Sequence, residues 1–138
     1  MSNHSGFSLI ELMITIAVLS IIVAIAVPSY QAQVRKARLE EARSLLLENV
    51  HFMEQHYAKH GRFKKNSTQW PTLPHTASAY FSIGFTSQAK GEMSDGYRLR
   101  AQPVASYQKT EERYLEVDHN GNVQLCGKQD NKNRCEAY

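Results

Sequence analysis

The stretch "GFSLIELMITIAVLSIIVAIAVPSY", from Gly6 to Tyr30, decides how the rest of the chain is interpreted. From Phe7 to Val27 every residue is apolar apart from Ser8, Glu11, Thr15 and Ser20. As an α-helix this run is about 31 Å long, which matches the hydrocarbon thickness of a bilayer. A carboxylate near the start of such a helix costs about 2.5–3.5 kcal/mol on insertion scales, so Glu11 needs a specific partner.

Three interpretations of this apolar run compete. A secretory signal peptide has a basic start, a shorter apolar core and a small-residue cleavage site, whereas "VPSYQAQ" follows here without an A-x-A-like site. A plain membrane anchor fits the length but leaves Glu11 unexplained. The third interpretation is a helix that stays in the membrane until it packs against copies of itself.

The residues "GFSLIE" resemble the cleavage and methylation motif of type IV pilins and the related pseudopilins. The resemblance implies that a prepilin peptidase cuts after Gly6 and methylates the new first residue, Phe7. It also implies that Glu11 serves subunit assembly and that Pro28 bends the helix. The expected domains are a leader peptide (1–6), a transmembrane or fibre-core helix segment (7–30) and a globular pilin head (31–138).

Electrostatics agrees with the role that this resemblance gives to Glu11. A carboxylate buried in an apolar fibre core is costly unless a cation lies next to it. The amine that cleavage exposes on Phe7 is the cation available at that depth, so we expect Glu11 to meet the terminal amine of a neighbouring subunit. The leader "MSNHSG" departs from the family pattern, because it contains no Lys or Arg.

After Pro28 the sequence becomes amphipathic, with one apolar stripe at three- and four-residue steps. The stripe consists of Tyr30, Val34, Ala37, Ala42, Leu45, Leu46, Val50, Met53 and Tyr57. Gly61 is a plausible C-cap, so we predict one long helix over residues 7–60. His56 and His60 are four residues apart, as metal ligands can be, but no HExxH-like motif accompanies them. We expect a packed or solvated face there and no metal site.

The remaining sequence predicts a small antiparallel sheet. A loop rich in turn formers (61–75) follows the helix, and Trp70 and Leu73 are expected to anchor it to the core. Strand-like runs follow at 80–86, 96–104, 112–118 and 122–126, with turn signals at 94–96 and 118–121. The predicted fold class is α+β, in which the long N-terminal helix packs on a sheet of about four strands.

Two cysteines, Cys126 and Cys135, bracket a polar tail. Outside the cytoplasm they would form a disulfide, whereas two reduced thiols are expected in a cytosolic protein. In the pilin family a final cysteine pair closes a C-terminal loop, the D-region, and this pair has that layout. Residues 45–63 and 67–74 also resemble the neisserial-type minor pilins ComP, PilX and PilV, although ComP-type receptors carry more cysteines in this region.

No catalytic motif is visible, so we expect neither an enzyme nor a cofactor. The leading hypothesis is a type IV pilus subunit, of the minor class, that serves adhesion, aggregation or natural competence. Its expected partners are other pilin subunits, the prepilin peptidase and the inner-membrane assembly machinery. It would reside in the inner membrane as a precursor and then in the pilus fibre at the cell surface.

Two alternatives remain open at this point. One is a DNA-binding minor pilin that acts as a DNA-uptake receptor, with phosphate contacts from a basic stripe. The candidate stripe consists of Lys90, Arg98, Arg100, Lys109, Lys128, Lys132 and Arg134. The other alternative is a pseudopilin of a type II secretion system. The net charge of +3 is mild and does not decide between them.

Overall fold

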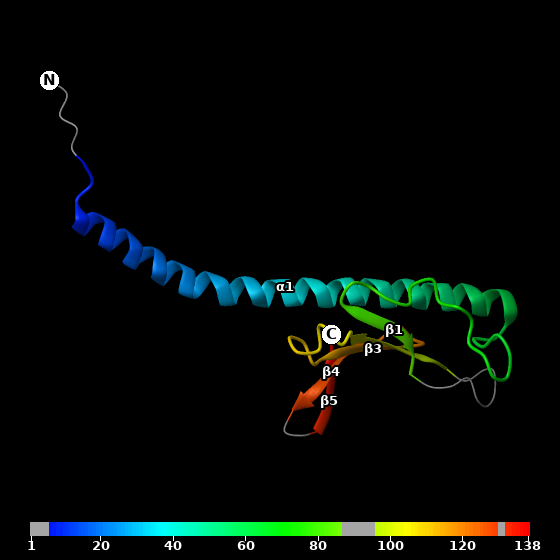
Figure 1. Ribbon diagram of the computed structural model, residues 1–138. Helices are drawn as coiled ribbons and strands as arrows, with labels where there is room; N and C mark the ends of the chain where they lie inside the picture. The colour runs from blue at the N-terminus through cyan, green and yellow to red at the C-terminus, as the bar shows by residue number, and fades with distance from the viewer. Residues whose placement is uncertain (1–5, 87–95, 130–131) are drawn as a thin grey trace. The chain divides into compact units, whose positions relative to one another are not determined.

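The computed structural model describes residues 6–86, 96–129 and 132–138. The chain divides into two compact units, Met1–Lys36 and Ala37–Tyr138. One helix, α1 (Leu9–His60), runs through both units and is followed by five strands (Figure 1). The predicted long helix is therefore confirmed, with its start two residues later than expected.

In the first unit, α1 opens with a capping box formed by Ser8 and Glu11. The backbone N–H of Glu11 donates to Ser8 Oγ at 3.3 Å, and the backbone N–H of Ser8 donates to Glu11 Oε2 at 3.0 Å. This reciprocal pair satisfies two backbone donors that a helix start otherwise leaves unbonded. Glu11 thus has a partner within its own chain, and its expected contact with a neighbouring subunit stays a prediction.

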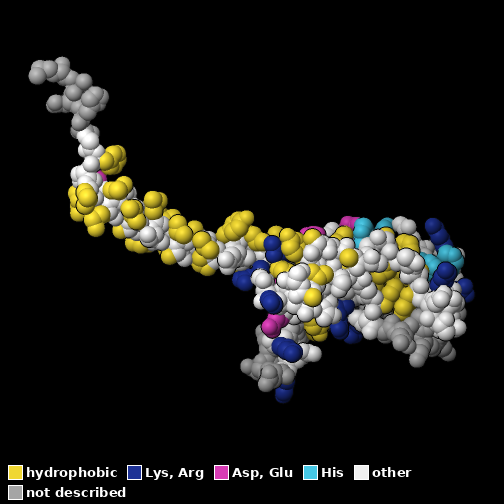
Figure 2. All heavy atoms as spheres, viewed as in Figure 1, with side chains coloured by type: hydrophobic (Ala, Val, Ile, Leu, Met, Phe, Trp, Pro, Cys, Tyr) yellow, Lys and Arg dark blue, Asp and Glu magenta, His cyan; other side chains and the backbone are white. Residues whose placement is uncertain are grey.

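The large apolar side chains from Phe7 to Val27 are exposed, and Figure 2 shows them along the face of this segment that is in view. By length and composition, α1 contains one stretch that is apolar enough to cross a membrane. Pro28 lies inside α1, and the helix continues through it. A bend at Pro28 stays a prediction.

In the second unit, α1 contributes one face to the core. The buried residues of this face are Leu39, Ala42, Leu46, Asn49, Val50 and Met53. Four of them belong to the predicted stripe, whereas Leu39 and Asn49 were not predicted. The two end residues of the predicted stripe are not buried: Tyr30, in the first unit, is 71% exposed, and Tyr57 is 43% exposed. The ring of Tyr57 instead packs on Phe63, at 4.6 Å between ring centroids.

The sheet of the second unit is an antiparallel meander. Its strands are β1 (Phe81–Phe85), β2 (Arg98–Pro103), β3 (Tyr114–Asp118), β4 (Val123–Gln129) and β5 (Lys132–Ala137). Each strand pairs with its neighbours in sequence, in the order β1-β2-β3-β4-β5. The first four strands overlap the predicted runs, but β4 continues to Gln129, three residues beyond the predicted end. The fifth was predicted as a polar loop, because every residue of β5 is exposed and shows no apolar alternation.

Successive side chains of a strand point to opposite faces of the sheet, so every second residue points toward α1. In β2 and β3 the inward residues are Leu99, Ala101, Leu115 and Val117, all fully buried. The predicted turn at 118–121 is present, and Gly121 there adopts a φ of +80°. The turn predicted at 94–96 lies mostly outside the described residues.

The loop between α1 and β1 is fixed by aromatic stacking and by one buried amide. Trp70 stacks on Phe85 with ring centroids 4.5 Å apart, and Leu73 is buried, as predicted. Asn49, which is fully buried, donates from Nδ2 to the carbonyl of His75 at 2.7 Å. Its Oδ1 accepts the backbone N–H of His75 at 3.1 Å. Asn49 thus acts as a two-point clamp between helix and loop.

Candidate nucleic-acid interface

The seven cations of the predicted stripe fall into separate groups. Arg98 and Arg100 lie in β2, Lys109 lies in the connection between β2 and β3, and Lys128, Lys132 and Arg134 lie in the β4–β5 hairpin. Lys90 lies outside the described residues. Arg100 and Lys128 nevertheless line one shared cavity of about 450 Å³. A single stripe that joins all the described members stays a prediction.

Arg100 is neutralised by its neighbours on the outer face of the sheet. Its Nε and Nη2 donate to Glu116 Oε1 at 2.8 and 2.6 Å. Its guanidinium also lies 4.5 Å from the ring centroid of Tyr114. Because β2 and β3 place Arg100 directly opposite Glu116, the strand register itself creates this pair. Arg100 is thus already engaged, and its charge is compensated.

Arg98 faces a second carboxylate, since the same register places it opposite Asp118. Although desolvation opposes the effect, hydrogen bonds from the side chain and backbone of Asn122 and from the backbone of Asn120 lower the pKa of Asp118. Asp118 is therefore an anion at neutral pH. The outer face of the sheet thus carries one ion pair, Arg100–Glu116, and the register places Arg98 and Asp118 at directly opposed positions beside it.

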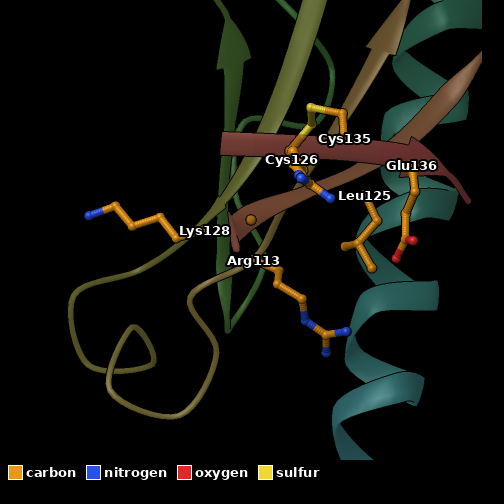
Figure 3. A pocket seen from close by; sticks show the side chains of 8 residues that line it. Arg113, Leu125, Cys126, Lys128, Cys135 and Glu136 are labelled. Atoms are coloured by element: carbon orange, nitrogen blue, oxygen red, sulfur yellow. A yellow bond between two sulfur atoms is a disulfide. The ribbon is translucent and has the colours of Figure 1, made fainter. Parts of the chain in front are cut away.

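The β4–β5 hairpin carries cations that are not compensated in this way. Within the described ranges, Lys128, Lys132 and Arg134 are exposed and make no ion pair. Figure 3 shows the side chain of Lys128 extending away from the hairpin. Exposed, unpaired cations of this kind can contact phosphate groups, and each contact releases counterions from the nucleic acid.

Strand β4 of the hairpin contributes Val123 and Leu125 to the core, whereas β5 is exposed throughout and is held by backbone pairing and a disulfide. Cys126 and Cys135 are direct partners in the register, and their sulfur atoms are bonded (Figure 3). The expected disulfide-closed C-terminal loop is thus present, and it takes the form of a two-stranded ribbon. The Cα atoms of the two cysteines are 4.1 Å apart, as suits a directly opposed pair of residues.

A cavity of about 350 Å³ lies beside the disulfide. Its lining includes Arg113, Lys128, Arg134 and one carboxylate, Glu136 (Figure 3). Arg113 donates from Nε and Nη2 to the two oxygens of the buried Glu111, both at 2.7 Å, and these bonds raise the pKa of Arg113. Gly127 leaves room for this arrangement, because a Cβ there would lie 2.9 Å from Arg113 Cγ. The cavity thus has one fixed guanidinium and two cations for which the described residues supply no ion pair.

A further group of cations, which the sequence analysis did not single out, lies where α1 ends. Lys59, Arg62 and Lys65 are exposed there, and His60 is the last residue of the helix. The signal was present in the sequence as "KHGRFKK" (59–65), but it was interpreted only as the start of a loop. Figure 2 shows Lys, Arg and His side chains gathered at this end of the second unit.

The histidine pair of the sequence analysis lies beside this group. The rings of His56 and His60 stack with centroids 4.4 Å apart. Burial, together with the neighbouring His60, lowers the pKa of His56, so this ring is neutral at pH 7. The part of the chain that the structure describes contains no cluster of three or more His, Cys, Asp or Glu residues that could hold a metal ion.

Two family models match the chain. The model described as "Type IV minor pilin ComP, DNA uptake sequence receptor" matches residues 28–132. The model described as "Prokaryotic N-terminal methylation motif" matches residues 1–27. Together they cover both the apolar helix and the head.

Solved structures of minor pilins share this fold. The NMR structure of the minor DNA-uptake pilin ComP from Neisseria subflava is 32% identical, with a TM-score of 0.57, and the match covers 73% of this chain and 95% of that one. The type IV pilin ComP from Neisseria meningitidis is 28% identical, with a TM-score of 0.54, over 78% of this chain and 98% of that one.

A major pilin is also similar in its N-terminal part. The type IV major pilin protein PilE1 of Neisseria gonorrhoeae is 40% identical over 65 residues. That match covers 47% of this chain and only 39% of the relative's length. The likeness to ComP structures therefore extends much further along the chain than the likeness to this major pilin.

Proposed function

Since the chain belongs to the family of the type IV minor pilin ComP, we propose that it is a pilus subunit whose head binds duplex DNA during uptake. The N-methylation motif and the apolar helix fit a membrane-anchored precursor that is assembled into the surface pilus with other pilin subunits. The family match and the C-terminal disulfide favour this role over that of a type II secretion pseudopilin.

The maturation that we propose follows the N-terminal motif. A prepilin peptidase removes the leader 1–6 after Gly6 and methylates Phe7, and the assembly machinery of the inner membrane then extracts the segment 7–30 into the fibre core. The head 31–138 stays outside that core. Phe7 is 83% exposed and precedes the helix start, which leaves the bond after Gly6 accessible to a peptidase. Mass spectrometry of the chain from purified fibres tests this step, because a mature chain that still begins at Met1 would refute it.

The observation that supports DNA binding most directly is the hairpin, whose exposed cations make no ion pair with any residue that the structure describes. A duplex carries one negative charge per about 1.7 Å of its axis, so several cations on one ribbon can contact successive phosphates. Lys128 and Arg134 line the same cavity, beside a guanidinium that Glu111 holds in place. In the described outer face of the sheet, by contrast, Arg100 is engaged by Glu116 and is poorly placed to attract a polyanion.

The test is a fluorescence-anisotropy titration of a labelled duplex with residues 31–138 at several salt concentrations. This fragment contains every residue of the hydrophobic core, so it is expected to fold without the apolar helix. We expect affinity to fall with salt. The double variant Lys128→Gln/Arg134→Gln should flatten the log–log slope by about 2, at about 0.9 per lost phosphate contact.

The matched control is Lys109→Gln, which removes an exposed cation of the candidate stripe from a different segment. It should leave the salt slope almost unchanged. No detectable binding by the parent fragment at low salt would refute the proposed DNA binding. An equal effect of the control and the double variant would show that the hairpin has no special part in it.

A further inference from the structure

We infer that β5 is an interface between two copies of this chain, in which the two β5 strands pair antiparallel about Cys135. The inference does not rest on the proposed DNA binding, because the partner is a second head. It adds to the pilus subunit a surface through which two heads of the same chain join edge to edge.

The two edges of the sheet differ in how they are covered. The edge strand β1 is closed by the loop that precedes it. The N–H of Ile83 donates to the carbonyl of Thr76, and the N–H of Ser78 donates to the carbonyl of Phe81, both at 2.7 Å. The opposite edge strand, β5, is exposed over its whole length, and within the described ranges no backbone bond covers its outer side. An exposed strand edge is a template for pairing with another strand.

The ladder between β4 and β5 shows which backbone groups lie free along this edge. The N–H of Tyr138 donates to the carbonyl of Val123 at 3.0 Å, so these residues form a hydrogen-bonded pair. Such pairs alternate with non-hydrogen-bonded pairs along an antiparallel ladder, in which the Cα atoms lie closer together. The pair Cys126–Cys135 is therefore non-hydrogen-bonded, which agrees with its Cα separation of 4.1 Å. The residues whose N–H and C=O groups point away from β4 are Asn133, Cys135 and Ala137.

These three residues are spaced so that a second β5 can pair with them symmetrically. In an antiparallel pair centred on Cys135, this residue faces Cys135 of the second copy, and Asn133 faces Ala137 of that copy. Each facing pair exchanges two N–H···O=C bonds. Because both copies use the same surface, the contact is isologous and closes as a dimer.

The charged side chains of β5 fit the same arrangement. Arg134 and Glu136 are two residues apart, so they lie on one face of the strand, and both are exposed. Among the described residues neither makes an ion pair. Pairing about Cys135 places Arg134 directly opposite Glu136 of the second copy, and the symmetry repeats this contact. Charges on an edge strand usually oppose strand addition, but opposite charges that face each other across two strands stabilise the pairing.

The experiment measures the self-association of residues 31–138 by sedimentation velocity at low ionic strength. We expect the parent fragment to show a monomer–dimer equilibrium. In Glu136→Arg two arginines face each other across the strands, and in Arg134→Glu two glutamates do. Each variant alone should therefore dimerise at least tenfold more weakly than the parent. An equimolar mixture of the two variants should dimerise about as tightly as the parent, because each arginine again faces a glutamate.

Ala137→Pro tests the backbone pairing separately from the charges. It removes one outward N–H, and since Ala137 lies opposite Gln124 in a non-hydrogen-bonded pair, no bond to β4 is lost. This variant should also dimerise at least tenfold more weakly. The matched control is Lys109→Glu, which makes the same change of charge as Arg134→Glu outside β5 and should dimerise like the parent. Circular dichroism checks that every variant folds.

Three results would overturn the inference. The first is a parent fragment that stays monomeric at millimolar concentration. The second is a dimer that Glu136→Arg and Ala137→Pro leave unchanged, since another surface would then hold it. The third is a mixture of the two charge variants that stays monomeric. Because no DNA is present, none of these results bears on the proposed function.

Discussion

Replacing Asn49 by Ala is expected to destabilise the head far more than a typical helix substitution. Asn49 is fully buried, and its amide makes both hydrogen bonds that tie the backbone of His75 to α1, at 2.7 and 3.1 Å. The variant leaves one N–H and one C=O without these partners. Unsatisfied buried groups cost about 1–3 kcal/mol each, and because His75 is only half-buried the lower part of that range applies.

The sum of these terms is about 2–3 kcal/mol of lost unfolding free energy. Alanine is the better helix former and returns roughly half a kcal/mol, which leaves the sign unchanged. At about 4–8 °C per kcal/mol for a domain of this size, the melting temperature should drop by roughly 10–20 °C. The assay is urea denaturation of residues 31–138, monitored by circular dichroism. Both variants are fitted with one common slope of unfolding free energy against urea concentration.

Glu48 provides the matched control, because it contacts the same loop residue from the surface. Its Oε2 lies 2.7 Å from His75 Nε2, and the two side chains are 55% and 38% exposed. An exposed pair of this kind contributes at most about 1 kcal/mol, so Glu48→Gln should be mild. The reasoning would be refuted if Asn49→Ala cost less than 1 kcal/mol, or if Glu48→Gln cost as much as Asn49→Ala.

Three further predictions concern other parts of the chain. Glu11→Val should abolish incorporation into fibres while the head still folds, as fibre immunoblots and circular dichroism will show; normal incorporation would contradict the assembly role of Glu11. Replacing Cys126 and Cys135 by Ser should cost about 2–3 kcal/mol in urea denaturation, from the loop entropy of a ten-residue ring; an unchanged midpoint would contradict this. Because the pKa of His56 is lowered in the folded chain, the unfolded chain binds this proton first, near pH 6.5. The unfolding free energy should therefore fall as the pH drops through 6.5, less steeply for His56→Gln, and equal slopes would contradict the role of His56.

The sequence predicted those parts of the fold in which burial leaves a periodic pattern. Ala42, Leu46, Val50 and Met53 recur at helical spacing, and the first four strands alternate or are rich in β-forming residues, so both layers were found. Strand β5 leaves no such pattern, since backbone pairing and the Cys126–Cys135 bond hold it while all its side chains face solvent. Asn49 was missed for a related reason, because a polar residue on an apolar stripe becomes interpretable only when its loop partner is known.

The candidate interface was less predictable than the fold. Composition identified the cations, but only the register shows that Arg100 lies against Glu116 and that Arg98 faces Asp118. Whether a charge is free depends on cross-strand neighbours that are sixteen or more positions away in sequence. The cation group Lys59, Arg62 and Lys65 could have been found from the density of cations at 59–65 alone, since residues so close in sequence stay close in space.

The consecutive order of the strands has a consequence for how quickly the head reaches its native state. Each strand pairs only with the strands directly before and after it in sequence, so the sheet requires no pairing between distant segments. Topologies built from such near neighbours in sequence pass through a smaller entropic barrier and fold faster than Greek-key sheets of equal size. Strand β5 lies at the edge of the sheet, so the Cys126–Cys135 bond joins only two neighbouring strands and constrains no other part of the sheet.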